Sequence, residues 1–196
     1  MSKARTAVLI SGRGSNMMAL VEAARAADFP AEVVCVVSNR ADARGLDFAA
    51  DNGIAARVID HKAYPTREAF EAALDDYLRS MGVEAIALAG FMRVLTGDFI
   101  ARWDGRMINI HPSLLPAYKG LHTHERAIAD GAKVHGCSIH LVTPELDGGP
   151  VLLQAEVPVL PDDTPDTLAA RVLTEEHRLY PQALAWLANR ILEESE

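Results

Sequence analysis

The sequence Met107-Ile-Asn-Ile-His-Pro-Ser-Leu-Leu-Pro116 organises the rest of the chain. Its start predicts a β-strand over residues 106–110, which Pro112 ends because proline has no N–H group to donate to the ladder. Side chains two positions apart on a strand lie on the same face, so Asn109 and His111 point the same way. An amide and an imidazole side by side can both donate to one developing negative charge. This stretch therefore predicts part of a catalytic site.

A third polar residue, Asp147, lies in the turn Leu146-Asp-Gly-Gly-Pro150. Its carboxylate is a candidate to hold the His111 imidazole and to favour the charged form of that ring. A single histidine near a strand end is more often a structural residue than a catalyst. The combination with Asn109 and Asp147, between loops rich in proline and glycine, favours the catalytic interpretation.

The composition fits one globular α/β domain over residues 1–196, with 49% hydrophobic and 23% charged residues. A net charge of −8 argues against a nucleic-acid or membrane-surface partner, because such partners need a broad basic face. No apolar run approaches the roughly 20 residues that span a bilayer, and the first residues lead into a strand rather than a signal peptide. Cys35 and Cys137 lie in apolar runs typical of buried free thiols, so we expect a cytoplasmic protein.

A glycine loop, Ser11-Gly-Arg-Gly-Ser-Asn16, follows the continuous apolar strand Ala7-Val-Leu-Ile10. The next residues have helical spacing, and we expect Ser15 or Asn16 to cap that helix. Free N–H groups and the positive end of the helix dipole meet at such a loop. The loop therefore predicts an anion-binding site.

The anion is best predicted as a single phosphate monoester. The P-loop pattern is absent, and the dinucleotide pattern G-x-G-x-x-G starts at Gly12 and Gly14 but has Met17 at its third glycine. Arg40, after the strand predicted over 32–38, lies where NADP enzymes bind a 2′-phosphate. An NADP-dependent oxidoreductase therefore stays open as an alternative, as does a nucleotide-binding module without catalysis.

Alternating strand and helix patterns predict the fold. Strands are predicted over 7–10, 32–38, 55–59, 84–89, 106–110, 134–142 and 151–159. Helices are predicted after residue 16, over 43–51, over 66–81 with Thr66 as cap, over 122–129, and from Thr164-Pro165 onward. Strands alternate with helices up to residue 130 and a hairpin-like pair follows. This order predicts an α/β fold with a doubly wound, mostly parallel, Rossmann-like sheet and an antiparallel C-terminal portion, whose ligands bind at the carboxyl ends of the strands.

Two further groups of residues bear on the site. Phe91-Met-Arg-Val-Leu95 is a candidate pocket wall for a flat, partly anionic ligand, although the same residues also suit the start of a helix. The histidines at 122, 124, 135 and 140 have no spacing typical of a metal site, so no metal is expected.

Five blocks of the sequence resemble the phosphoribosylglycinamide formyltransferases, a branch of the folate-dependent formyltransferase family. The blocks cover residues 11–16, 89–95, 108–116, 119–124 and 136–150. Asn109-Ile-His-Pro-Ser-Leu-Leu-Pro116 and Leu146-Asp-Gly-Gly-Pro150 resemble the wider family, whereas Gly14-Ser-Asn16 and Lys119-Gly-Leu-His-Thr-His124 favour this branch. The resemblance extends over essentially the whole chain and implies a single domain with the Rossmann-like formyltransferase fold.

The resemblance implies an enzyme that transfers the formyl group of 10-formyltetrahydrofolate to the amine of 5-phosphoribosyl-glycinamide in purine biosynthesis, without a metal. It implies that the ribonucleotide is bound by Gly14, Ser15, Asn16 and Glu176. It implies that the catalytic residues are Asn109, His111 and Asp147. It implies that the folate co-substrate is bound by Arg67, Met92, Arg93, Val94, Leu95, Asn109, Thr143, Pro144, Glu145, Leu146 and Asp147. The N-terminal half would bind the ribonucleotide and the C-terminal half the folate, in a monomer or homodimer.

The implied mechanism is direct attack of the substrate amine on the formyl carbon. Asn109 and His111 would stabilise the oxyanion, and Asp147 would assist. A 10-formyltetrahydrofolate hydrolase, with water as acceptor, is the nearest alternative, although it typically has an N-terminal regulatory domain. Methionyl-tRNA formyltransferase would be expected to add a C-terminal domain and a basic surface. Arg13 departs from the family pattern, in which a smaller polar residue also occurs.

Overall fold

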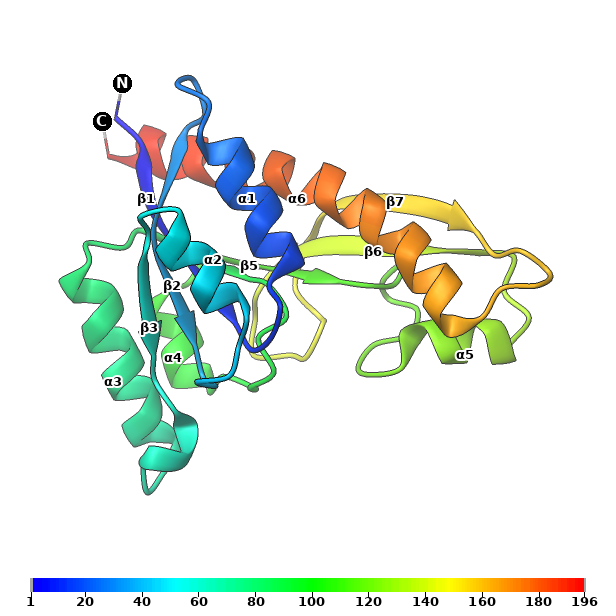
Figure 1. The fold of residues 1–196 in the computed structure, drawn as a ribbon, viewed down its shortest axis with the longest axis horizontal. Helices are drawn as coiled ribbons and strands as arrows, with labels where there is room; N and C mark the ends of the chain where they lie inside the picture. Colours follow the sequence, from blue (N-terminus) through cyan, green and yellow to red (C-terminus); the bar gives the residue numbers. More distant parts are fainter. Residues whose placement is uncertain (1, 196) are drawn as a thin grey trace.

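The computed structural model describes residues 2–195 and contains a seven-stranded sheet in the order β3-β2-β1-β4-β5-β6-β7 (Figure 1). Its strands are β1 (Ala4–Ile10), β2 (Ala31–Ser38), β3 (Ala55–Val58), β4 (Ala85–Leu88), β5 (Met107–His111), β6 (Val134–Leu141) and β7 (Val151–Pro158). The first five strands pair in parallel, and β6 is antiparallel to both β5 and β7. The predicted doubly wound, mostly parallel sheet with an antiparallel C-terminal portion is confirmed.

Helices cover both faces of the sheet. They are α1 (Ser15–Ala24), α2 (Gly45–Asp51), the short 3₁₀-helix η1 (His61–Ala63), α3 (Arg67–Ser80), α4 (Gly97–Arg102), α5 (Thr123–Ala129) and α6 (Pro165–Glu194). Buried residues of α1, α2 and α6 belong to one apolar cluster, and those of α3 and α4 to a second. Figure 1 shows α6 running along the sheet beside α1, with α3 and α4 near the opposite face.

The central strand β1 separates these two halves of the core. Val8 and Ile10 pack in the cluster that contains α1 and α6, whereas Ala7 and Leu9 pack in the cluster that contains α3 and α4. A strand buried on both faces needs apolar residues at every position. This requirement explains the continuous apolar run in the sequence.

The long helix α6 is tied to the sheet by Tyr180, whose hydroxyl donates to the carbonyl of Leu88 over 2.6 Å. The side chain is fully buried, at 0% exposure. We expect Tyr180→Phe to lower the free energy of unfolding by about 1–2 kcal/mol, because this bond is lost in an apolar interior. Urea unfolding followed by circular dichroism would measure the change. Tyr64→Phe, at a half-buried ring, is the matched control, and equal unfolding midpoints in the two variants would contradict the prediction.

The predicted cap of the first helix is wrong. Gly14 is the N-cap of α1, at a φ of 70°, and no side chain of the described residues caps the helix there. Because glycine alone adopts this left-handed conformation at little cost, the chain turns at Gly14, and Ser15 and Asn16 are already helical. The caps predicted at Thr66 and Thr164 are confirmed, since each hydroxyl accepts from the backbone three residues on.

Most predicted strand and helix boundaries differ from the structure by one to three residues. β5 ends at His111 rather than at residue 110, because His111 still pairs with Ser138 of β6. The alternative that residues 91–95 start a helix is wrong, since α4 begins only at Gly97 after a cap by Thr96. The chain from 91 to 95 is therefore free to line a site.

Both cysteines are buried free thiols, as predicted. Burial raises the pKa of Cys35 and of Cys137 to about 12, so neither thiol is a nucleophile at neutral pH. Among the described residues, no helix has the length and apolar character that crossing a membrane requires.

Candidate active site

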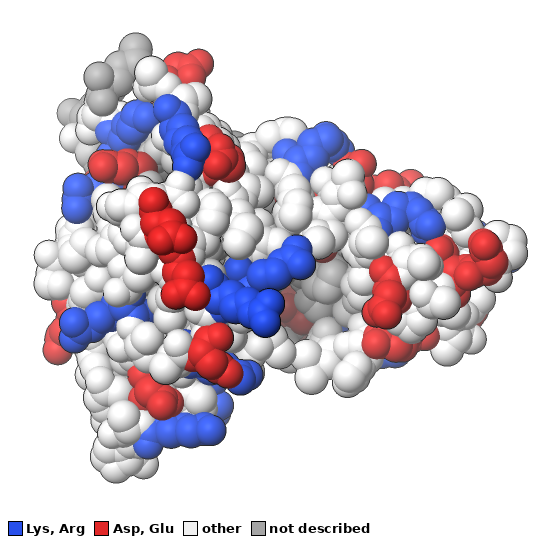
Figure 2. Space-filling view, viewed as in Figure 1, with Lys and Arg blue, Asp and Glu red and all other residues white. Residues whose placement is uncertain are grey.

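The carboxyl ends of β1, β4 and β5 lie side by side, because these strands are parallel neighbours. They lead respectively into the glycine loop from Ser11, into the loop of residues 89–96, and into the segment after His111. Figure 2 shows a hollow near the middle of one face, beside the amino ends of α1 and α2, with Lys and Arg side chains gathered along one side of it. One edge of the sheet therefore holds all three predicted segments.

His111 lies between two acceptors and is almost buried. Its Nδ1 is 3.6 Å from Oδ2 of Asp147, and the two side chains are 8% and 7% exposed. Its Nε2–H donates to the carbonyl of Tyr118 over 2.8 Å. A ring with an acceptor at each nitrogen is best matched by the imidazolium, which has two N–H donors. The Asp147 carboxylate is thus placed to stabilise positive charge that develops on His111.

Asp147 joins two loops over this histidine. Its Oδ2 also accepts from the backbone N–H of Gly120 at 2.9 Å, and Lys119 forms an ion pair with Glu145 at 3.0 Å. Asp147 itself has a φ of 50°, a left-handed conformation that aspartate tolerates better than most residues. At Gly149 a Cβ would lie 1.8 Å from the Leu141 carbonyl, so only glycine lets the turn approach β6 this closely.

His140, on β6, is a further member of this cluster that the sequence did not assign to the site. The amide Nδ2 of Asn109 donates to its Nε2 over 3.3 Å, and the same nitrogen is 3.8 Å from Oδ1 of Asp147. The ring's Nδ1–H donates to the Leu141 carbonyl, and burial lowers the pKa of His140, so the ring stays neutral and accepts from Asn109. His140 could not be assigned from the sequence, because the pairing register that places Asn109 opposite His140 on β5 and β6 is known only from the structure.

The glycine loop contacts the last helix. Nδ2 of Asn16 donates to Oε1 of Glu176 over 3.1 Å, and Glu176 is 7% exposed. Burial raises the pKa of Glu176, against the lowering by the Asn16 bond. Oδ1 of Asn16 is buried without a hydrogen-bond partner among the described residues, and such an atom calls for a ligand or water that donates to it.

The loop of residues 91–95 presents apolar side chains at the same edge. Met92 and Val94 are 63% and 60% exposed, whereas Leu95 is buried. Met92 and Arg93 also line a hollow of about 570 Å³, which Arg40 borders. Arg40, the residue considered for a 2′-phosphate, is already paired with Asp42 at 2.8 Å.

Two predicted parts of the folate site, Arg67 and the segment from Thr143 to Leu146, make fewer contacts with the other candidate residues. Arg67 lies exposed in the first turn of α3, and within residues 2–195 its side chain forms no hydrogen bond or ion pair with the other candidates. The segment from Thr143 to Leu146 is a loop, in which the Leu146 side chain is 58% exposed. Within the same part of the chain, no three His, Cys, Asp or Glu side chains are grouped as a metal site would require.

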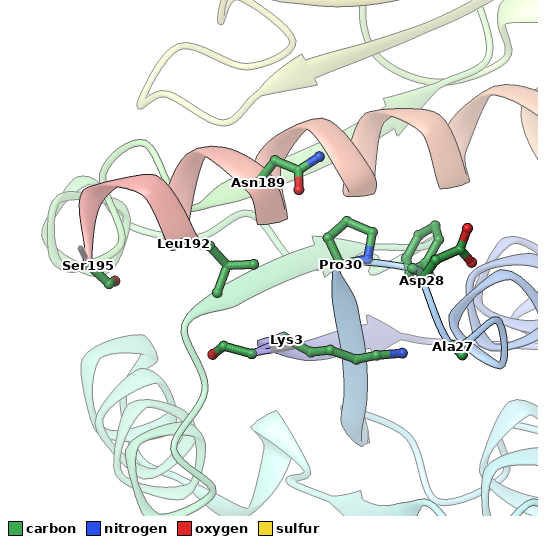
Figure 3. A pocket seen from close by; sticks show the side chains of 9 residues that line it. Lys3, Ala27, Asp28, Pro30, Asn189, Leu192 and Ser195 are labelled. Carbon is green, nitrogen blue, oxygen red and sulfur yellow. The ribbon is translucent and has the colours of Figure 1, made fainter.

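A second hollow, of about 620 Å³, lies at the other end of the molecule (Figure 3). Lys3, Pro30 and Asn189 line it, so it opens at the amino edge of the parallel strands. Figure 3 shows Lys3 and Asp28 as its charged side chains, from different segments. This hollow has none of the polar side chains that meet around His111.

The sequence and the fold are similar to those of known formyltransferases. Residues 4–184 match the formyl transferase family. The phosphoribosylglycinamide formyltransferase of Escherichia coli (strain K12) is 47% identical over 182 residues, which are 93% of this chain and 86% of that protein. The solved structure of phosphoribosylglycinamide formyltransferase from Brucella melitensis has 53% sequence identity and a TM-score of 0.92, over 95% of this chain and 96% of that chain.

Some relatives are much longer. The trifunctional purine biosynthetic protein adenosine-3 of Bos taurus is 47% identical over 187 residues, which are 95% of this chain but 18% of that protein. The chain thus spans less than a fifth of the length of this relative.

Proposed function

The chain belongs to the formyl transferase family, and from this premise we propose that it transfers the formyl group of 10-formyltetrahydrofolate to the amine of 5-phosphoribosyl-glycinamide. The products are formylglycinamide ribonucleotide and tetrahydrofolate. The observation that carries the proposal is the meeting of Asn109, His111 and Asp147 at one strand end, next to a loop suited to an anion.

The chemistry follows from these groups. The substrate amine attacks the formyl carbon, and the carbonyl oxygen becomes a tetrahedral oxyanion. Asn109 has one amide N–H on His140 and a second free to donate to that oxygen. The Nε2–H of His111 turns from the Tyr118 carbonyl to the same oxygen, and Asp147 stabilises its positive charge. Collapse of the intermediate breaks the bond to N10 of the folate, and the proton lost by the amine is delivered to that nitrogen.

The ribonucleotide fits the glycine loop and α6. Its phosphate meets the N–H groups at the start of α1, from Gly14 to Asn16, where the helix dipole favours a dianion. Its ribose hydroxyls donate to Glu176 and to the unpartnered Oδ1 of Asn16. Both acceptors then have the donors that buried polar atoms require.

The folate fits the remaining candidates. Met92, Val94 and Leu95 cover its rings on one side, and the loop of residues 143–147 covers them on the other, with Asn109 at the formyl group. Arg67 and Arg93 are assigned to the anionic tail. Within the one domain, residues 1–196, the N-terminal half thus supplies the glycine loop for the ribonucleotide and one wall of the folate site, and the C-terminal half supplies the other folate contacts and the catalytic residues.

One assay separates the alternatives. Purified protein is mixed with 10-formyltetrahydrofolate, with and without glycinamide ribonucleotide, and the folate absorbance is followed. Turnover that requires the ribonucleotide supports the transferase. Equal turnover without it identifies a hydrolase, and no folate turnover together with binding of NADP would overturn the proposal in favour of an oxidoreductase.

Arg93→Ala is expected to raise the KM for the folate about tenfold with little change in kcat. A charge-assisted hydrogen bond contributes about 1.5–3 kcal/mol, and about 1.4 kcal/mol corresponds to a factor of ten. Steady-state kinetics at saturating ribonucleotide measure the effect. Arg25→Ala, which removes an exposed guanidinium paired with Glu22, is the matched control, and an unchanged folate KM in Arg93→Ala would remove Arg93 from the folate site.

A cytoplasmic location and a monomer or homodimer complete the proposal. The two free thiols support a reducing compartment. Sedimentation of the purified chain at micromolar concentration distinguishes the monomer from the dimer.

A further inference from the structure

Ser11 lies between the two loops that are assigned to the two substrates. The pairing of β1 with β4 ends where the N–H of Ala89 donates to the Leu9 carbonyl over 2.9 Å. The chain then turns at Gly90, whose φ is 74°, and leaves the strand direction. The N–H of Met92 has no strand to donate to, and it donates to Oγ of Ser11 over 2.8 Å.

The Ser11 hydroxyl is itself held in one orientation. Its proton is donated to Oδ1 of Asn39, at the end of β2, and Nδ2 of Asn39 donates to Nδ1 of His61 over 3.2 Å. Ser11 and Asn39 are 6% and 3% exposed, so water does not compete for these bonds. Because the only hydroxyl proton of Ser11 is donated to Asn39, a lone pair of the same oxygen is directed at the backbone N–H of Met92.

The other end of the same loop is fixed differently. The carboxylate of Glu71, 3% exposed, accepts from the backbone N–H and the hydroxyl of Thr96, at 3.1 and 3.0 Å. Glu71 belongs to α3 and has no bond to the glycine loop among the described residues. The Glu71 anchor therefore holds only the loop of residues 89–96, called here the folate loop. Ser11, in contrast, joins the folate loop to the glycine loop.

We propose that Ser11 is a positioning residue for the transfer reaction. Its hydroxyl fixes the folate loop, at Met92, relative to the glycine loop, in which Gly12 follows Ser11. The inference rests on the function proposed above. The reacting amine belongs to the ribonucleotide, which is assigned to the glycine loop. The formyl group belongs to the folate, which is assigned to residues 91–95. A displacement of about 1 Å between reacting atoms can lower a rate about 100-fold, so the Ser11 bond acts on the chemical step.

The test compares Ser11→Ala with Ser38→Ala. Ser38 is a matched control because it is fully buried and ends the neighbouring strand β2, opposite Ile10. Among residues 2–195 its hydroxyl bonds only the Arg40 backbone. Single-turnover rates are measured with both substrates saturating. The dissociation constants of tetrahydrofolate and of glycinamide ribonucleotide are measured separately, and circular dichroism reports the fold.

In Ser11→Ala the single-turnover rate is expected to fall at least tenfold, while each dissociation constant stays within threefold of the wild type. Ser38→Ala should keep both the rate and the constants within threefold. Ser11→Thr, which keeps the hydroxyl, should recover most of the rate, a result that a purely structural loss would not give.

A Ser11→Ala rate within threefold of the Ser38→Ala rate overturns the inference, as does a loss explained wholly by weaker binding of one ligand. Failure of the proposed function has a different signature. In that case the wild-type chain itself shows no turnover that depends on glycinamide ribonucleotide.

Discussion

His111→Asn is expected to lower kcat by about 10²–10³-fold while the protein remains folded. A positioned donor to an oxyanion contributes about 10²–10³ in rate, and the proposed mechanism assigns that donation to His111. Asparagine is chosen because its amide can still donate toward Asp147, whose carboxylate also accepts from the Gly120 N–H, so this buried acceptor keeps its partners. Steady-state kinetics at saturating levels of both substrates measure kcat, and circular dichroism reports the fold.

His122→Asn is the matched control for this prediction. Its imidazole is 74% exposed in the nearby loop, and its φ of 56° is one that asparagine adopts readily. The control should keep kcat within a factor of about two, because an exposed side chain that makes no contact with the catalytic groups has little effect when it is replaced. A His111→Asn enzyme whose kcat equals that of the control would remove His111 from the chemistry.

Asp147→Asn is expected to lower kcat about 100-fold. The substitution removes the negative charge 3.6 Å from Nδ1 of His111, so the imidazolium that forms at the oxyanion loses its counter-ion. The asparagine carbonyl can still accept from Gly120, and asparagine suits a φ of 50°, so the loop should keep its path. The loss should therefore appear in kcat rather than in the unfolding midpoint.

Asp28→Asn is the control for the loss of one carboxylate. Asp28 lines the hollow at the opposite edge of the sheet, so its kcat should match that of the wild type. If Asp147→Asn unfolded at a much lower urea concentration than Asp28→Asn and kept its kcat per folded molecule, Asp147 would be a structural residue instead.

The order of elements was predictable because local patterns carry it. A few adjacent residues are enough to predict each of the following features: the strand from the apolar run at residues 7–10, the turn from the glycine loop after it, and the helix starts from the caps at Thr66 and Thr164. The cap of α1 was mispredicted for a local reason too. Serine and asparagine are good caps in general, but the left-handed turn before α1 favours Gly14 instead.

The sequence by itself determined which chemical groups are present and which strand ends carry them. Asn109 and His111 share a face because the period of a strand is two, and the glycine loop precedes a helix whose dipole favours an anion.

Only the tertiary structure decided which distant residues meet these groups. His140 reaches Asn109 through the antiparallel register of β5 and β6, Asp147 reaches His111 through a turn packed on β6, and Ser11 reaches Met92 across β1 and β4. Each of these contacts depends on strand order and register. Those are set by burial of the two apolar clusters over the whole sheet, and no local window of sequence contains that information.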